Sequence, residues 1–327
     1  MNKILVTGGA GFIGSNLCEH LLMNGYKVVC LDNFSTGHMY NIQHLIDGYP
    51  NRFALIKGDI RNFETCIRAV DGVDFVFHEA ALGSIPRSIE DPITTNDVNV
   101  GGFLNMLVAA RDYKVKRFIF AASSSTYGDN SDLPKFEERI GKPLSPYALT
   151  KYVDELYADV FARTYGIEYI GLRYFNVFGR RQDPSSMYAA VIPLFIKQYL
   201  NHKSPQINGD GSNTRDFTYI DNVIQMNMRA LKTTNPQAIN QVYNVAGGER
   251  TSINKLADMI KSYLVQYDFS ISDINPIYGA HRLGDIPHSF ACIDKAKRLL
   301  NYSPLSSFQE GLNETIKWYY NHRAEIM

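Results

Sequence analysis

Tyr147 and Lys151 are the residues whose types and spacing most directly suggest acid–base chemistry. They follow Pro146, which is common in the first turn of a helix, and side chains at i and i+4 share one helical face. A free tyrosine ionises near about pH 10, too high for a base at neutral pH. A neighbouring ammonium favours the phenolate. The pair could therefore remove a proton, although the same spacing also occurs by chance on exposed helices.

A glycine-rich turn supplies a second chemical feature close to the start of the chain. Gly8 allows a tight turn after a short apolar run, Gly11 leaves room for a pyrophosphate, and Gly14 lets a helix pack on the sheet. The helix N-terminus offers free N–H groups to phosphates. Asp32 ends a second apolar run, where it can bond a ribose diol and repel a 2′-phosphate. The sequence predicts an NAD site, because a plain loop does not explain the strand, helix, strand and aspartate together.

The predicted dinucleotide site supports a catalytic role for Tyr147 and Lys151. An oxidised nicotinamide would favour the Tyr147 phenolate further, and Lys151 could bond the nicotinamide ribose. The serine-rich segment Ser123, Ser124 and Ser125 follows another apolar run. With the dinucleotide site and the serines nearby, a catalytic role for Tyr147 and Lys151 is a better interpretation than a chance spacing.

The elements that must position these residues repeat the pattern of the first segment. Apolar runs alternate with helical segments along the first half of the chain, which predicts an α/β fold with a doubly wound parallel sheet (Rossmann). Ligands of such sheets bind at the carboxyl ends of the strands, where the polar clusters occur. The expected strands are 4–6, 27–31, 53–56, 74–77, 117–121 and 167–172, and the main expected helices are 97–112 and 145–164.

The alternation of apolar runs and helical segments becomes less regular beyond about residue 178, where Pro, Gly, Asn and Tyr become frequent. We expect residues 1–178, with about 217–245 returning to the sheet, to form the NAD-binding domain. Residues 179–216 and 246–327 are expected to form a smaller C-terminal α/β substrate-binding domain.

Composition narrows the class of protein. Lys plus Arg is 33 and Asp plus Glu is 33, so the basic excess of a nucleic-acid binder is missing. The four cysteines include no C-x-x-C pair, so we expect no metal site and a reducing compartment. No apolar run is long enough to span a membrane, and Met1 stands too close to the first strand for a signal peptide. We expect a cytoplasmic protein with a small-molecule partner.

Several motifs in one order resemble the extended short-chain dehydrogenase/reductase superfamily. The closer likeness is to the nucleotide-sugar 4-epimerases that interconvert UDP-N-acetylglucosamine and UDP-N-acetylgalactosamine in bacterial polysaccharide biosynthesis. The likeness spans the whole chain and rests on the glycine turn, Gly58-Asp59-Ile60-Arg61, His78-Glu79-Ala80-Ala81, Ala122 to Gly128, Ser145-Pro146-Tyr147, Lys151, Arg173 to Gly179 and Arg215-Asp216-Phe217.

This resemblance implies a cycle of oxidation and reduction. Tyr147 takes the proton of the sugar 4-hydroxyl, one of the three serines shares the hydrogen bond, and carbon 4 passes a hydride to NAD. The 4-keto sugar swings about its pyrophosphate link and takes the hydride back on the opposite face. The family also implies a homodimer through the apolar faces of helices 97–112 and 145–164, although core packing alone could explain those faces.

The resemblance also implies which residues contact each ligand. The cofactor residues are Gly8, Gly11, Phe12, Ile13, Gly14, Asp32, Asn33, Ser35, Thr36, Gly37, Asp59, Ile60, Ala80, Ala81, Tyr147, Lys151 and Tyr174. The UDP-sugar residues are Gly83, Ser84, Ser123, Ser124, Tyr147, Asn176, Ala190, Val191, Gln206, Asn208, Arg215, Arg282, Asp285 and Ser289. Arginines suit a diphosphate because they make bidentate contacts, but a structural ion pair is the alternative for each.

Two segments separate this chain from its relatives. Dehydratases and decarboxylases of the superfamily place carboxylates before the residue equivalent to Tyr127, whereas this chain has Ser124, Ser125 and Thr126, which favours epimerisation. The segment 284–289 resembles the family segment that borders the sugar pocket, and this resemblance implies that a small residue at Ser289 leaves room for a 2-acetamido group. The corresponding uronic acid, UDP-glucose/UDP-galactose and a non-catalytic NAD-binding regulator remain alternatives. His78-Glu79 is interpreted as structural rather than as an acid–base pair.

Overall fold

The computed structural model describes residues 1–280 and 287–326. Its main sheet has seven strands, all parallel, in the order β11–β6–β5–β4–β1–β2–β3. The chain reverses direction across the sheet between β1 and β4, the switch point where such folds bind ligands. The predicted doubly wound sheet is confirmed. Its strands are β1 Lys3–Thr7, β2 Lys27–Asp32, β3 Phe53–Lys57, β4 Phe75–His78, β5 Arg117–Ser123, β6 Tyr169–Tyr174 and β11 Gln241–Val245.

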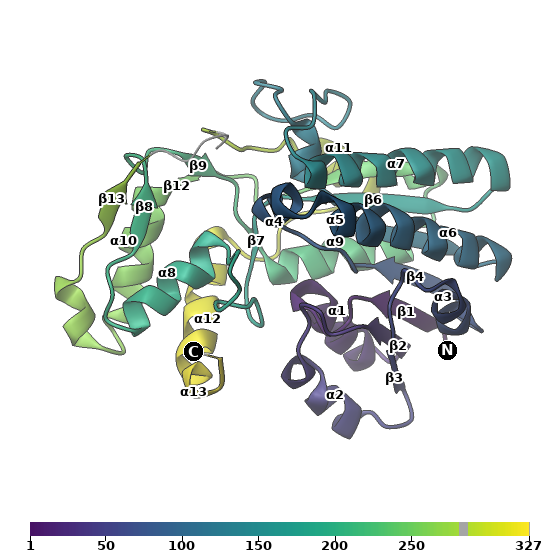
Figure 1. Cartoon of the computed structure of the whole chain (residues 1–327), viewed down its shortest axis with the longest axis horizontal. Coiled ribbons are helices and arrows are strands. Elements are labelled where there is room, and N and C mark those ends of the chain that lie inside the picture. The colour runs from purple at the N-terminus through teal and green to yellow at the C-terminus, as the bar shows by residue number, and fades with distance from the viewer. Residues whose placement is uncertain (281–286, 327) are drawn as a thin grey trace.

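The central strands are apolar along most of their length because both faces of the sheet are covered. Side chains alternate along β1: Ile4 and Val6 join the core on one face, and Leu5 joins the core on the other. The first face is covered by α1 (Phe12–Met23) and α9 (Ile220–Lys232). The second is covered by α3 (Phe63–Val70), α6 (Gly102–Asp112) and α7 (Pro146–Tyr165), as Figure 1 shows.

Both main helices expected from the sequence are present. The first begins as a π-helical turn, η2 (Asp97–Gly101), and continues directly as α6. The second is α7, which starts where Ser145 Oγ accepts a hydrogen bond from the Ala148 N–H at 3.1 Å. Gly166, at φ 74°, ends that helix in the left-handed conformation that glycine adopts without strain.

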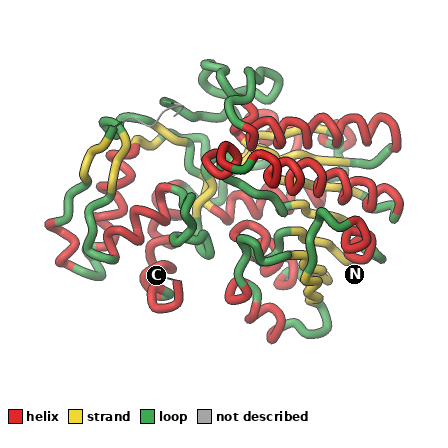
Figure 2. Tube along the Cα trace, viewed as in Figure 1, coloured by secondary structure: helices red, strands yellow, loops and turns green. Residues whose placement is uncertain are grey.

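A second lobe of short strands and helices lies beside the sheet (Figures 1 and 2). It contains the small pairs β8–β13 and β9–β12, while β11 lies at the edge of the main sheet. The domain boundaries given above remain a prediction. The elements of this lobe are α8 Val191–Leu200, β8 Gln206–Asn208, β9 Thr214–Arg215, β12 Thr251–Ser252, α10 Ile253–Leu264, η5 Phe269–Asp273, β13 Ile277–Gly279, α12 Phe308–Asn321 and α13 Arg323–Ile326.

The remaining elements are short connections. They are η1 Met39–Asn41, α2 Gln43–Gly48, α4 Ile85–Glu90, α5 Pro92–Asn96, η3 Ser124–Tyr127, β7 Val177–Phe178, β10 Thr218–Tyr219, η4 Pro236–Ala238 and α11 Asp294–Leu300. No helix within residues 1–280 and 287–326 combines the length and apolarity needed to cross a bilayer.

Candidate functional site

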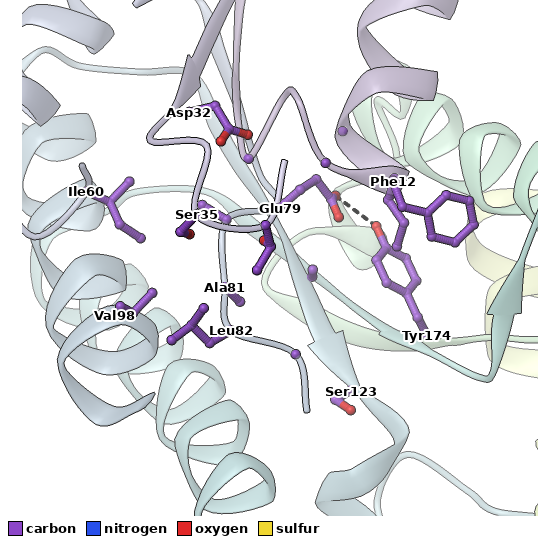
Figure 3. Close-up of a pocket in the computed structure, with 18 of the residues that line it drawn as sticks. Phe12, Asp32, Ser35, Ile60, Glu79, Ala81, Leu82, Val98, Ser123 and Tyr174 are labelled. Atoms are coloured by element: carbon purple, nitrogen blue, oxygen red, sulfur yellow. Dashed lines mark hydrogen bonds between the residues drawn. The ribbon is translucent and has the colours of Figure 1, made fainter. Parts of the chain in front are cut away.

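A cavity of about 540 Å³ opens at the carboxyl ends of β1, β2, β4, β5 and β6 (Figure 3). Residues that are far apart in the sequence meet there, because parallel strands end at the same edge of the sheet. Every predicted cofactor residue except Gly37 lines it. The predicted sugar residues that line it are Gly83, Ser123, Ser124, Tyr147, Asn176 and Ala190.

The glycine turn brings the backbone against the cavity. Gly8 has φ +66°, and a Cβ there would lie 2.8 Å from the backbone of Ala80. A Cβ on Gly14 would lie 2.1 Å from the Gly8 carbonyl oxygen, so α1 can pack this close to the turn only with glycine. A Cβ on Gly11 would meet only that oxygen, at 3.2 Å. The turn therefore forms a cradle of bare backbone at the cavity wall, which fits a pyrophosphate.

Asp32 is held rigidly at the end of β2. Its Oδ2 accepts the Ala10 N–H at 2.9 Å and its Oδ1 accepts the Phe34 N–H at 2.7 Å. Burial raises the pKa of Asp32, and these two bonds oppose that rise. Gly37 lies behind this carboxylate rather than in the cavity: a Cβ there would lie 3.0 Å from Asp32 Oδ1.

The next strand end contributes a second carboxylate. Asp59 receives two hydrogen bonds from the Arg61 guanidinium, at 2.7 and 3.0 Å, and one from Asn33 at 2.8 Å. The Arg61 bonds lower the pKa of Asp59 to about 2. Asp59 is therefore ionised at neutral pH, and Ile60 beside it adds an apolar surface to the same wall.

Tyr147 and Lys151 both face the cavity from the first two turns of α7. Lys151 Nζ donates to the Ala121 carbonyl at 3.0 Å, which ties α7 to β5. The helical pair predicted from the sequence thus lies beside the glycine turn, even though more than a hundred residues separate them along the chain.

The structure distinguishes among the three serines. Ser123 and Ser124 line the cavity, but Ser125 does not. Ser123 Oγ accepts hydrogen bonds from the Ser125 hydroxyl at 2.8 Å and from the Ser125 N–H at 3.2 Å. With both bonds accepted, the Ser123 hydroxyl proton is available to a partner in the cavity.

Glu79, for which a structural role was predicted, also lines the cavity. Its Oε1 accepts the Tyr174 hydroxyl at 2.9 Å, and Asn227 donates to that hydroxyl at 2.9 Å. Burial raises the pKa of Glu79 to about 7. His78 before it is buried and bonded to Thr7, in keeping with a structural role.

Other cavity residues carry little sequence signal because their contribution is backbone or apolar surface. Most of them lie at or shortly after the carboxyl end of a strand, which was the main indication in the sequence. They are Leu31, Gly58, Leu82, Val98, Ala121, Ala122, Val177 and Gln182.

The remaining predicted sugar residues that the structure describes are not among those that line this cavity. Ser84 caps α4, Val191 begins α8, and the others lie in the second lobe, where the Ser289 N–H donates to the Thr214 carbonyl at 3.0 Å. Arg282 and Asp285 fall outside the described residues. The roles of these residues stay predictions. The second-lobe residues are Gln206 and Asn208 on β8, Arg215 on β9, and Ser289.

Comparison with known proteins gives consistent matches over nearly the whole chain. The model of the NAD dependent epimerase/dehydratase family matches residues 4–246. A putative UDP-glucose 4-epimerase of Methanocaldococcus jannaschii is 38% identical, over 98% of this chain and 99% of its own.

Two solved structures share both fold and sequence with this chain. A UDP-N-acetylglucosamine 4-epimerase of Methanobrevibacter ruminantium, in complex with UDP-N-acetylmuramic acid, matches with a TM-score of 0.89 at 38% identity, covering 98% of this chain and 99% of its own. A UDP-glucuronic acid 4-epimerase of Bacillus cereus, in complex with UDP-glucuronic acid and NAD, matches with a TM-score of 0.88 at 35% identity, with the same coverage.

Proposed function

This chain belongs to the NAD-dependent epimerase/dehydratase family, and on that premise we propose that it is a UDP-sugar 4-epimerase whose substrates are UDP-N-acetylglucosamine and UDP-N-acetylgalactosamine. The observation that carries the proposal is one continuous cavity. It joins the glycine turn and Asp32, at the dinucleotide end, to Tyr147, Lys151 and Ser123.

Each of these side chains has a role in the proposed reaction. Tyr147 removes the proton from the sugar 4-hydroxyl and returns it, Ser123 donates a hydrogen bond to the reacting oxygen, and Lys151 favours the phenolate. The glycine turn and Asp32 would hold NAD, which would supply the acceptor for the hydride of carbon 4 and later its donor. The chain must therefore grip the nucleotide firmly and the hexose loosely, so that both faces of the ring can be presented.

The carboxyl groups of the cavity favour epimerisation over dehydration. Elimination of water needs an additional acid and base near the sugar. Ser124, Ser125 and Thr126 occupy the stretch before Tyr127, where related dehydratases carry acidic residues. Asp32 and Asp59 lie at the dinucleotide end of the cavity, and the carboxyl of Glu79 is engaged by the Tyr174 hydroxyl.

Space in the wall supports an N-acetylated sugar. Gly83 lines the cavity, and a Cβ placed there would meet no atom within 4 Å. A 2-acetamido group needs such room, and the small residue at Ser289 is proposed to leave more. The relative from M. ruminantium has the same sugar specificity in its name, whereas the B. cereus relative is named for the 6-carboxylated sugar.

The deciding experiment is to incubate the purified protein with UDP-N-acetylglucosamine, UDP-glucose and UDP-glucuronic acid separately, and to measure each 4-epimer by NMR. We expect the N-acetylgalactosamine epimer to form fastest without added NAD, because NAD is regenerated in each turnover and retained. The Tyr147→Phe variant is the control and should form none. Fastest turnover of another sugar would reassign the substrate, and no product from any would favour a non-catalytic NAD-binding protein.

A further inference from the structure

The ammonium of Lys151 is held by the protein from behind the cavity. Its Nζ donates to the Ala121 carbonyl at 3.0 Å and to Asp154 Oδ2 at 3.4 Å. An ammonium has three N–H donors, so two are engaged by β5 and by the next turn of α7. Lys151 also lines the cavity, which leaves its third donor for a ligand there. Asp154 thus contributes directly to the direction in which Lys151 points.

Asp154 is an unusual residue for this position because it is completely buried. The exposed fractions of the Lys151 and Asp154 side chains are 3% and 0%. Asp154 Oδ1 has no hydrogen-bond partner among the described residues. A half-satisfied carboxyl costs stability in an interior that an apolar side chain would fill more favourably. Burial raises the pKa of Asp154 to about 7, and the Lys151 charge opposes this rise.

The other ionisable groups around Lys151 have separate partners or are neutral. On β4, burial lowers the pKa of His78 to about 3, and Glu79 bonds to Tyr174. On α7, Glu155 forms a buried ion pair with Arg173 at 2.7 Å. Within the part of the chain that the structure describes, Asp154 is therefore the carboxyl that bonds the ammonium directly.

We propose that Asp154 is a positioning residue for the reaction, which orients the Lys151 ammonium and, when ionised, offsets part of the charge that favours the Tyr147 phenolate. The inference rests on the proposed role of Tyr147 as the base. Asp154 then has two effects: its oxygen holds Lys151 in place, and its charge opposes proton loss from Tyr147. Removing the charge alone should make Tyr147 a base at lower pH.

Asp154→Asn removes the charge and keeps an oxygen that can accept the Lys151 hydrogen bond. The readout is the ultraviolet absorbance of tyrosinate, taken as the part of the pH titration that Tyr147→Phe abolishes in the same background. We expect its midpoint to fall by about one pH unit in Asp154→Asn, with an equal shift in the acid limb of kcat/KM. An unchanged or higher midpoint overturns the proposal, since a packing role would not move it.

Asp154→Ala, which removes the acceptor as well, tests the orienting effect. It should weaken binding of NAD about tenfold in calorimetry, while Asp154→Asn restores most of that affinity. Equal affinities of the two variants would contradict the orienting role.

A third measurement does not depend on the stability of the Asp154 variants. The carboxyl carbon resonance of Asp154 should titrate at higher pH in Lys151→Met than in the unmodified protein, because the opposing charge is gone. Identical titrations would show that the two groups are not coupled. These titrations need no turnover. If the protein epimerises no UDP-sugar, the proposed function is refuted, and the role of Asp154 is still decided by the titrations.

Discussion

The glycine turn has a packing role and a ligand-binding role, and substitutions at two of its glycines can separate them. In Gly14→Ala the new Cβ would lie 2.1 Å from the Gly8 carbonyl oxygen and 2.8 Å from the Gly8 carbonyl carbon and the Gly9 Cα. All three are backbone atoms, so α1 must move away from β1 by more than about one ångström to restore ordinary contact. We expect a loss of about 3 kcal/mol or more in the free energy of unfolding, the range of severe overpacking.

Gly11→Ala is the matched control, since it adds the same methyl group three residues away. Its Cβ meets the Gly8 carbonyl oxygen at 3.2 Å, only slightly closer than ordinary contact, and its backbone at φ −77° suits alanine. The free energy of unfolding should change by less than about 1 kcal/mol. Because Gly11 lines the cavity, NAD affinity should instead fall about tenfold or more.

The assays are urea unfolding followed by circular dichroism, and calorimetric titration with NAD. We expect Gly14→Ala to lose stability and Gly11→Ala to lose NAD affinity. Equal stability of Gly14→Ala and Gly11→Ala would refute the packing argument, and unimpaired NAD binding by Gly11→Ala would refute the cradle.

Three further predictions concern the sugar site, a buried carboxyl and assembly. Ser289→Tyr should suppress turnover of UDP-N-acetylglucosamine and spare UDP-glucose; rates that fall together would contradict the proposed gate. Burial raises the pKa of Glu79 from 4.5 to about 7, so its ionisation destabilises the folded protein as pH rises through that interval. Glu79→Gln stays neutral, so its unfolding free energy relative to that of the unmodified protein should rise by about 2 kcal/mol between about pH 5 and pH 8. A difference in urea unfolding that does not change with pH would argue against this raised pKa of Glu79. Leu156 is 48% exposed on α7, on the helix proposed to form a dimer; Leu156→Asp should convert a dimer to a monomer in sedimentation, and a monomeric unmodified protein would exclude that interface.

Local patterns were sufficient for the sheet and for the dinucleotide end of the site. The turn at Gly8 and Gly14 and the acid at Asp32 are defined by short segments whose geometry follows from neighbouring residues. The two-sided burial of the sheet also appears in the sequence as unbroken apolar runs. The pairing of Tyr147 with Lys151 could also be predicted from the sequence, because one helix holds both side chains on one face.

The roles of individual polar groups depended on tertiary contacts. Ser123 and Ser125 are equivalent in sequence, and only the bend after β5 places one in the cavity with the other bonded behind it. Glu79 meets Tyr174, and Asp154 is enclosed beside Lys151, through packing of elements from distant parts of the chain. Desolvation and charge determine what such groups do, and both are set by residues remote in sequence. The sequence by itself therefore determined which chemical groups are available, whereas the fold decided which of them face the cavity and in what state of charge.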